Sequence, residues 1–345
     1  MMQDAGEIAR ATADYLTKRW GARTEVLRFE QIFGGASRET YRLRVGTGGQ
    51  ERGLILRRDP ETSLIDTERR LEYGAYEAIF GTDVPVPEPL FLEEDPSYLG
   101  RPFSIMVEIE NARTDVASLD AAQRQTIGEQ KWRILGSLAA KDPIALGFDR
   151  ITSVPAPAET AARELEYWAG VIDADEIHPQ PIGRAAIRWL RRNMPRPAQK
   201  LSVVHGDYRT GNFLFDPQAG IKGILDWEMC HIGDPLEDLA WSLDPLWSWG
   251  EPTLAGRLLP PAEAIAIWES ASGLNVDPVD FNWWRVFVSV KALAIWVSSS
   301  EDFQNGNSRE AILAYAGWVM TDRQNRILLD YLSPVSKGEL GGRIQ

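Results

Sequence analysis

The alternation of apolar and polar residues divides the first part of the chain into helices and strands. Residues 6–20 and 63–79 carry apolar side chains at helical spacing, and the other segments alternate as half-buried strands do. The strand-like stretches are EVLRFEQIF, ETYRLRV, GLILRR, DVPVPEPLFL and RPFSIMVEI. The second and third are joined by the glycine-rich GTGGQERG, which favours a hairpin. The predicted order is helix, three strands, helix and two strands.

From about residue 110 the pattern changes to amphipathic helices separated by proline-rich loops. Helical spacing occurs in residues 120–142, 160–173, 181–194, 260–273, 281–299 and 309–332. Two short β-type stretches, VVHGDYRTGN and GILDWE, interrupt this helical run. Reactive side chains are commonly presented on loops that follow such strands. We therefore expect two unequal lobes, a nucleotide-binding lobe at residues 1–108 and a mainly helical lobe at residues 109–345.

Composition and charge narrow the class of protein. The chain has 345 residues, of which 44% are hydrophobic and 25% charged, as in an ordinary globular protein. A formal net charge of −13 argues against a general nucleic-acid binder, because phosphate recognition needs clustered lysine and arginine. The acidity either steers a cationic substrate or, more simply, keeps the protein in solution.

Cysteine usage and the apolar segments indicate the compartment. The single cysteine, Cys230, excludes an internal disulfide and fits a reducing environment. The N-terminal residues carry acids where a secretory signal would carry positive charge. The longest apolar segment, residues 286–297, contains Lys291 and is too short for a membrane span. We expect a cytoplasmic protein with no membrane partner.

Three oxygen-bearing side chains stand at the ends of the two short β-type stretches. Asp207 and Asn212 follow the first, and Asp226 ends the second. Carboxylate and amide oxygens suit Mg²⁺ with a nucleotide triphosphate, whereas zinc would prefer histidine or cysteine ligands. A capped turn would also explain Asp207 and Asn212, but it does not predict Asp226. A serine hydrolase is poorly supported because the G-x-S-x-G turn is absent from the sequence.

The motifs HGDYRTGN, GILDWE and GDPLEDLAW resemble those of the aminoglycoside phosphotransferase and choline kinase branch of the kinase-like enzymes. More narrowly, the chain is similar to the phosphotransferase-like regions fused to some acyl-CoA dehydrogenases. The resemblance implies an α+β, bilobal, protein-kinase-like fold. Its small N-terminal lobe would be an antiparallel sheet with one main helix, and its larger C-terminal lobe would be mainly helical.

The resemblance also implies roles for residues of the central motif. Asp207 would accept the proton of a substrate hydroxyl as it attacks the γ-phosphoryl group, and Asn212 and Asp226 would hold magnesium. Arg209 would place a cation at the transferred phosphoryl group, although a surface arginine is the alternative. His205 is expected to hold the loop through hydrogen bonds rather than to carry a proton.

Further positions near the motif are expected to support it. Asp234 and Asp238 are interpreted as structural residues, with Asp238 supporting the catalytic loop from the start of a helix. Glu228 would either assist at the metal or be an exposed side chain.

In the first lobe, the resemblance points to a phosphate-covering loop and a hinge. The loop GGASRETYR would cover the triphosphate with backbone N–H groups and Ser37. The segment SIMVEIEN would supply the hinge, in which backbone groups of Glu108 and Ile109 bind adenine.

The chain departs from the family pattern on the third strand, where Arg57 replaces the expected lysine. Arginine keeps the charge and can bind phosphate bidentately, but its geometry differs from that of lysine. Strand alternation puts Arg57 and Arg58 on opposite faces, and a one-residue slip would exchange them. The expected acidic partner is Glu72 rather than Glu68, with a solvated helix face as the alternative for Glu72.

The acceptor is expected to be a hydroxyl group of a small molecule. Twelve residues separate Asp226 from Asp238, which leaves no room for the peptide-binding segment of protein kinases. Residues 112–195 and the helices after Trp241 would wall the acceptor pocket.

The identity of the acceptor stays open between a hydroxylated metabolite or acyl compound and an aminoglycoside-like antibiotic. Trp241, Trp247 and Trp249 would either stack on the acceptor or belong to the core. The cofactors implied are ATP and Mg²⁺. The alternative function is a nucleotide-binding pseudokinase that regulates a protein partner, motivated by the missing lysine. The sequence leaves the oligomeric state open.

Overall fold

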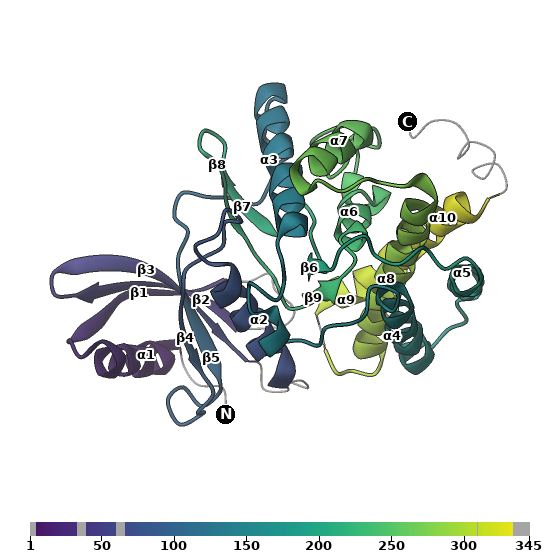
Figure 1. Cartoon of the computed structure of the whole chain (residues 1–345). Coiled ribbons are helices and arrows are strands. Elements are labelled where there is room, and N and C mark those ends of the chain that lie inside the picture. Colours follow the sequence, from purple (N-terminus) through teal and green to yellow (C-terminus); the bar gives the residue numbers. More distant parts are fainter. Residues whose placement is uncertain (1–4, 33–38, 60–65, 309, 334–345) are drawn as a thin grey trace.

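The computed structural model describes residues 5–32, 39–59, 66–308 and 310–333. Its first part has the predicted order of elements, shown in Figure 1. These elements are α1 (Ala5–Trp20), β1 (Thr24–Ile32), β2 (Glu39–Thr47), β3 (Gln50–Arg58), α2 (Asp66–Ile79), β4 (Pro89–Glu93) and β5 (Phe103–Val107). The strands form one antiparallel sheet in the order β1-β2-β3-β5-β4.

The sheet forms because alternate residues of its strands bury an apolar face. Tyr41, Leu43 and Val45 of β2 and Leu54 and Leu56 of β3 are all buried. Helix α1 packs on this face through side chains at helical spacing, namely Ile8, Tyr15 and Leu16. Together these residues form a small core separate from that of the helical part.

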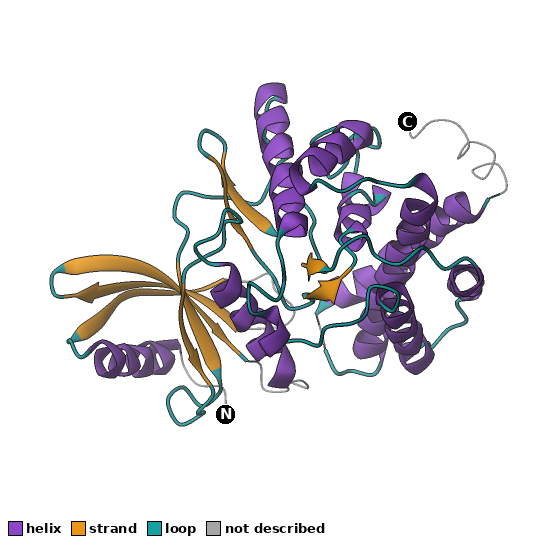
Figure 2. Ribbon diagram, in the orientation of Figure 1, coloured by secondary structure: helices purple, strands orange, loops and turns teal. Residues whose placement is uncertain are grey.

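The second part is mainly helical, and its described residues include four short strands. Its helices are α3 (Ala121–Ala140), α4 (Thr160–Asp175), α5 (Pro181–Arg192), α6 (Leu236–Ser242), α7 (Pro261–Ser272), α8 (Pro278–Gln304), α9 (Ala311–Tyr315) and α10 (Thr321–Leu332), with the short turns η1 (Phe148–Arg150) and η2 (Pro245–Ser248). The strands β6 (Ser202–Val204) and β9 (His231–Gly233) pair, as do β7 (Phe213–Asp216) and β8 (Gly220–Ile224). Figure 2 shows the five-stranded sheet with α1 beside it at one side, most of the helices at the other, and the short strands β6 and β9 among those helices.

One expected helix is interrupted. The pattern predicts a single helix over residues 309–332, but the π-helical segment η3 (Ala316–Met320) separates α9 from α10. Such a wider turn leaves the polypeptide helical while it shifts the phase of the side chains that follow. The apolar spacing alone did not reveal the shift.

The core of the helical part is rich in tryptophan. Its largest fully buried side chains include Trp132, Trp227, Trp241, Trp268, Trp283 and Trp284. Within the described ranges, no helix combines the length and the apolar character that a membrane span requires.

Helix α2 links the sheet to the helical part. Its buried residues Ala75, Tyr76 and Ile79 belong to the large core of the helical part, not to the core of the sheet. The lobe boundary between residues 108 and 109 therefore stays a prediction, because α2 and Met106 pack with elements beyond it. The position of α2 brings its side chains toward the loops that follow β6 and β8.

Candidate active site

The buried carboxylate of Asp238 binds the backbone of the loop that follows β6. One oxygen of Asp238 accepts the backbone N–H of His205 at 2.6 Å, and the other accepts that of Gly206 at 2.9 Å. Asp238 lies at the start of α6 and is 2% exposed. It therefore supports the loop, as expected from the sequence.

His205 also has a structural place. Its Nε2 lies 2.9 Å from the carbonyl oxygen of Leu225, and its Nδ1 accepts the backbone N–H of Asp207 at 3.1 Å. Burial disfavours the imidazolium and lowers the pKa of His205 to about 4. A neutral ring that donates through Nε2 and accepts through Nδ1 ties the loop to the segment before Asp226.

Gly206 permits a close approach that other residues would prevent. Its φ is +84°, in the left-handed region, and a Cβ there would lie 2.3 Å from the carbonyl oxygen of Met229. The loop can therefore pack directly against the chain that follows Asp226.

The carboxylate of Asp207 accepts hydrogen bonds from three side chains. Asn212 Nδ2 donates to Oδ2 at 2.6 Å, and Trp241 Nε1 donates to Oδ1 at 2.8 Å. Arg209 Nε lies 3.1 and 3.2 Å from the two oxygens. The structure thus brings Asp207, Arg209 and Asn212 together.

The contact from Trp241 was not predicted from the sequence. Trp241 is 1% exposed and packs against Trp247 at a ring distance of 5.2 Å, so it is a core residue that also reaches the site. The available signal was its position three residues after Asp238, which puts both side chains on one face of α6.

Asp226 faces the loop from the other side. The backbone N–H of Leu225 donates to the carbonyl oxygen of Asn212 at 2.8 Å, which brings Asp226 close to Asn212. Asp226 has φ +70°, an uncommon conformation for a residue with a side chain, and Tyr76 Oη accepts its N–H at 3.0 Å. Burial raises the pKa of Asp226, partly offset by the Arg57 guanidinium.

Arg57 and Arg58 point to opposite faces of β3. Arg57 pairs with the buried Glu72 of α2, and its Nη2 lies 3.8 Å from Asp226 Oδ1. Arg58 instead contacts Glu39 Oε2 at 3.1 Å and is 2% exposed. The strand register therefore directs Arg57, not Arg58, toward the loop residues.

The predicted nucleotide-site residues also include Ser37, Glu108 and Ile109. Ser37 lies outside the described residues. Glu108 uses its backbone N–H to donate to Gly53 at 3.0 Å, and its side chain pairs with Arg42 at 2.7 Å. The side chain of Ile109 lies against Gly223 of β8.

Glu228 and two tryptophans lie near the arginines of the site. Glu228 is partly buried, and its charge contributes to raising the pKa of Arg57. The guanidinium of Arg209 lies over the Trp247 ring at 5.1 Å. Trp249 is 45% exposed and is covered in part by Arg323, so its ring lies at the surface.

The side chains present fit a hard divalent cation. Asn212 donates through its amide nitrogen to Asp207, so its side-chain oxygen is the atom that could bind a metal. Asp226 is a carboxylate whose ionised form is disfavoured by burial and by neighbouring acids, so a cation would stabilise it. Asn212 and Asp226 would therefore hold Mg²⁺.

Residues 28–272 match the phosphotransferase enzyme family. The chain belongs to this family. An aminoglycoside phosphotransferase structure from Ralstonia eutropha JMP134 superposes on this phosphotransferase with a TM-score of 0.75 and 24% identity, over 93% of this chain and 97% of that one. The ternary complex of the aminoglycoside phosphotransferase APH(4)-Ia with AMP-PNP and hygromycin B gives 0.60 and 18%, over 94% and 100%. These likenesses confirm the kinase-like α+β fold.

Sequence relatives of the phosphotransferase are larger proteins. Acyl-CoA dehydrogenase family member 10 of Mus musculus is 30% identical over 224 residues, 63% of this chain and 20% of that protein. Acyl-CoA dehydrogenase family member 11 of Pongo abelii is 24% identical over 312 residues, 85% of this chain and 39% of that protein. The chain thus spans less than half of the length of either relative, and the predicted resemblance is confirmed.

The hydrogen bond from Trp241 predicts a kinetic effect of its removal. Trp241→Phe should lower kcat for phosphoryl transfer by roughly ten- to a hundredfold, because a hydrogen bond to a charged group is worth about 1.5–3 kcal/mol. Steady-state kinetics would measure it. Trp268→Phe is the matched control, since Trp268 is also fully buried and its Nε1 has no partner among the described residues. Equal kcat values for the two variants would contradict a role of Trp241 at Asp207.

Proposed function

We propose that this phosphotransferase transfers the γ-phosphoryl group of ATP to a hydroxyl group of a small molecule. The observation that carries the proposal is the convergence of Asp207, Asn212 and Asp226 beneath the Arg57–Glu72 ion pair. Phosphoryl transfer needs a group that accepts the proton of the acceptor, oxygen ligands that bind the metal, and a cation that binds phosphate.

Asp207 would act on the acceptor. As the hydroxyl oxygen attacks phosphorus, its proton passes to a carboxylate oxygen of Asp207, and the bond from the γ-phosphorus to the bridging oxygen breaks to release ADP. The hydrogen bonds from Asn212 and Trp241 fix the orientation of that carboxylate. Arg209 pairs with Asp207 in this structure. If the Arg209 side chain moved away from Asp207, its guanidinium would stabilise negative charge on the transferred phosphoryl group.

The remaining residues would bind the nucleotide. Asn212 and Asp226 would hold magnesium, which would neutralise negative charge on the phosphates. Arg57, oriented by Glu72, would bind phosphate oxygens in place of the family lysine. Ser37 would lie at the triphosphate. Because the N–H of Glu108 is engaged with Gly53, adenine would use the carbonyl of Glu108 and the backbone of Ile109.

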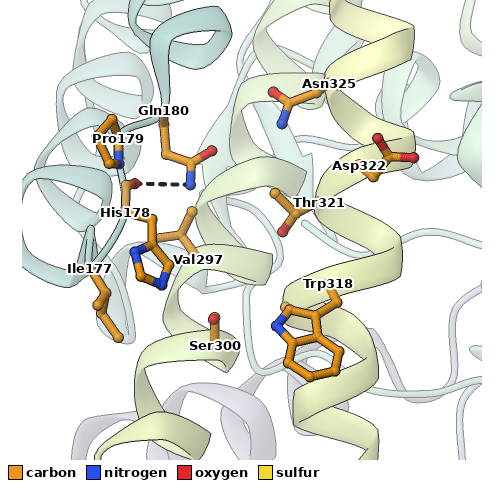
Figure 3. Close-up of a pocket in the computed structure, with 11 residues that line it drawn as sticks. Ile177, His178, Pro179, Gln180, Val297, Ser300, Trp318, Thr321, Asp322 and Asn325 are labelled. Atoms are coloured by element: carbon orange, nitrogen blue, oxygen red, sulfur yellow. Dashed lines mark hydrogen bonds between the residues drawn. The ribbon is translucent and has the colours of Figure 1, made fainter.

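A cavity of about 490 Å³ is a candidate for the acceptor's non-reacting part. Figure 3 shows residues of the α4–α5 loop facing residues of η3 and α10 across it, with α8 along one wall. The loop and these helices are the regions that the sequence assigns to the acceptor pocket. Val297 of this wall lies on α8 six residues after Lys291, which contacts the catalytic loop, and this spacing is a helical rise of about 9 Å.

The cavity lining favours an amphipathic acceptor. Trp318 is 75% exposed and offers an aromatic face. Thr321 and Asn325 add polar side chains to the lining of the cavity. A hydroxylated metabolite or acyl compound, or an aminoglycoside-like antibiotic, would combine such groups with a hydroxyl.

The proposal is tested by incubating the protein with ATP, Mg²⁺ and a pool of hydroxylated metabolites and antibiotics. Mass spectrometry should detect one acceptor that gains a phosphate group. Nucleotide binding without transfer to any acceptor would instead favour a pseudokinase that regulates a protein partner, the alternative that Arg57 in place of lysine suggests.

Removal of the proposed base should separate chemistry from binding. Asp207→Asn is nearly isosteric but cannot accept the proton, so kcat should fall by about 10²- to 10⁴-fold while the ATP dissociation constant is retained. Turnover and calorimetric titration measure the two quantities. Asp149→Asn, on an exposed turn, is the control. Unchanged turnover would remove Asp207 from the chemistry, and lost ATP binding would make it a metal ligand or structural anchor.

The two arginines of β3 give a second test. Arg57→Ala should weaken ATP binding by roughly tenfold or more, because it removes a charged hydrogen-bond donor, and Arg57→Lys should retain much of the affinity. Arg58→Ala should lower the free energy of unfolding, since Arg58 is buried and paired with the partly exposed Glu39, but leave ATP affinity near that of the wild type. The reverse pattern in titration would show that the other face of β3 meets the nucleotide.

A further inference from the structure

Lys291 is a buried ammonium group that the proposed chemistry does not use. It lies in the middle of α8, is 1% exposed, and has buried apolar neighbours in Val290 and Ala292. Burial of a charged amine is costly unless the group is paired and hydrogen-bonded. Its partners therefore indicate what the charge does.

Lys291 Nζ bridges a buried acid and the catalytic loop. It donates to Glu237 Oε1 at 2.9 Å and to the backbone carbonyl oxygen of Gly206 at 2.6 Å. The side chain of Glu237 is fully buried. The rings of Trp168 and Trp241 lie 5.5 and 5.1 Å from the ammonium nitrogen and cover other sides of it.

The Lys291–Glu237 pair continues into further ionisable side chains. The second oxygen of Glu237 lies 3.2 Å from His231 Nε2, which lies 3.7 Å from Glu164 Oε1. Burial opposes ionisation of Glu237, but the charges of Lys291 and His231 lower its pKa to about 2. Likewise, Glu164 and Glu237 outweigh burial and raise the pKa of His231 to about 9. Glu164, His231, Glu237 and Lys291 thus form a chain in which acidic and basic side chains alternate.

The contact with Gly206 acts on the peptide plane that precedes Asp207. This peptide consists of the carbonyl of Gly206 and the N–H of Asp207. Lys291 donates to the carbonyl oxygen, and His205 Nδ1 accepts the N–H at 3.1 Å. The previous peptide is held through the N–H of Gly206 by Asp238 at 2.9 Å. Gly206 lies in the left-handed region, and glycine has more backbone freedom than other residues. These contacts therefore set the direction in which the side chain of Asp207 projects from the loop.

We propose that Lys291 is a positioning residue for phosphoryl transfer, which fixes the peptide between Gly206 and Asp207 through its bond to the Gly206 carbonyl. This inference rests on the proposed function. A purely structural role for Lys291, as the counter-ion of Glu237, is the competing explanation.

Two variants separate these explanations. Lys291→Met keeps a similar length but removes the donor and leaves Glu237 without its ammonium partner. The double variant Lys291→Met with Glu237→Met also removes the carboxylate charge, so it leaves no unpaired charge in the pair and places no new donor beside the Gly206 carbonyl. Leu293→Ala is the control for a core defect, because Leu293 lies on α8 but packs against Gly183 of α5.

The measurements are turnover, ATP KM, thermal stability and hydrogen exchange of the peptide that spans residues 204–212. Turnover is followed with the acceptor from the metabolite pool and, independently, as phosphate release to water from Mg-ATP. Lys291→Met should lower kcat by roughly 10²-fold, the effect of a misplacement of about 1 Å, while ATP KM is little changed. Hydrogen exchange of the loop should be faster.

The double variant decides between positioning and charge pairing. It should regain stability relative to Lys291→Met but keep the low kcat and the fast loop exchange, whereas Leu293→Ala should lose stability with kcat near that of the wild type. If the double variant recovers both kcat and loop protection, Lys291 is only a counter-ion and the inference fails. A wild type that transfers phosphate neither to an acceptor nor to water contradicts the proposed function itself, which distinguishes the two failures.

Discussion

The site depends on a backbone loop that is fixed by buried polar contacts, both from Asp238 outside the loop and from the loop's own His205. Asp238 accepts two consecutive N–H groups of the loop, and Gly206 approaches the carbonyl of Met229 too closely to carry a Cβ. A buried carboxylate is costly unless such donors satisfy it, and buried backbone groups are costly unless they are paired. Each group therefore stabilises the other, and together they fix the backbone from which the side chain of Asp207 projects.

The charges gathered by this loop explain why it suits a metal and phosphates. Asp207, Asp226, Glu72 and Glu228 bring four acids to one place, and Arg57 and Arg209 bring two cations. Burial and neighbouring acids raise the pKa of Asp226, so the site is short of positive charge. A divalent cation held by Asn212 and Asp226 would supply that charge, and Arg57 and Arg209 would add positive charge for the phosphates.

Much of this arrangement is encoded by short-range patterns. The strand and helix order of the first part, the short strands around the loop and the opposite faces of Arg57 and Arg58 follow from alternation and spacing. The unpredicted parts depend on contacts between distant residues. Trp241 reaches Asp207 across 34 positions, Lys291 reaches Gly206 across 85, and Tyr76 reaches Asp226 across 150. No local pattern specifies such pairs, because they follow from how α2, α6 and α8 pack.

The central claim is that Asn212 and Asp226 hold a metal that presents the nucleotide to Asp207. A crystal structure with Mg²⁺ and AMP-PNP tests it most directly. We expect the metal at about 2.1 Å from an oxygen of each residue, since Mg²⁺ requires short octahedral contacts. The γ-phosphate should then contact Arg209, with the Asp207 carboxylate facing the acceptor side. A metal bound to neither Asn212 nor Asp226, or a nucleotide bound away from Arg57, would contradict the account.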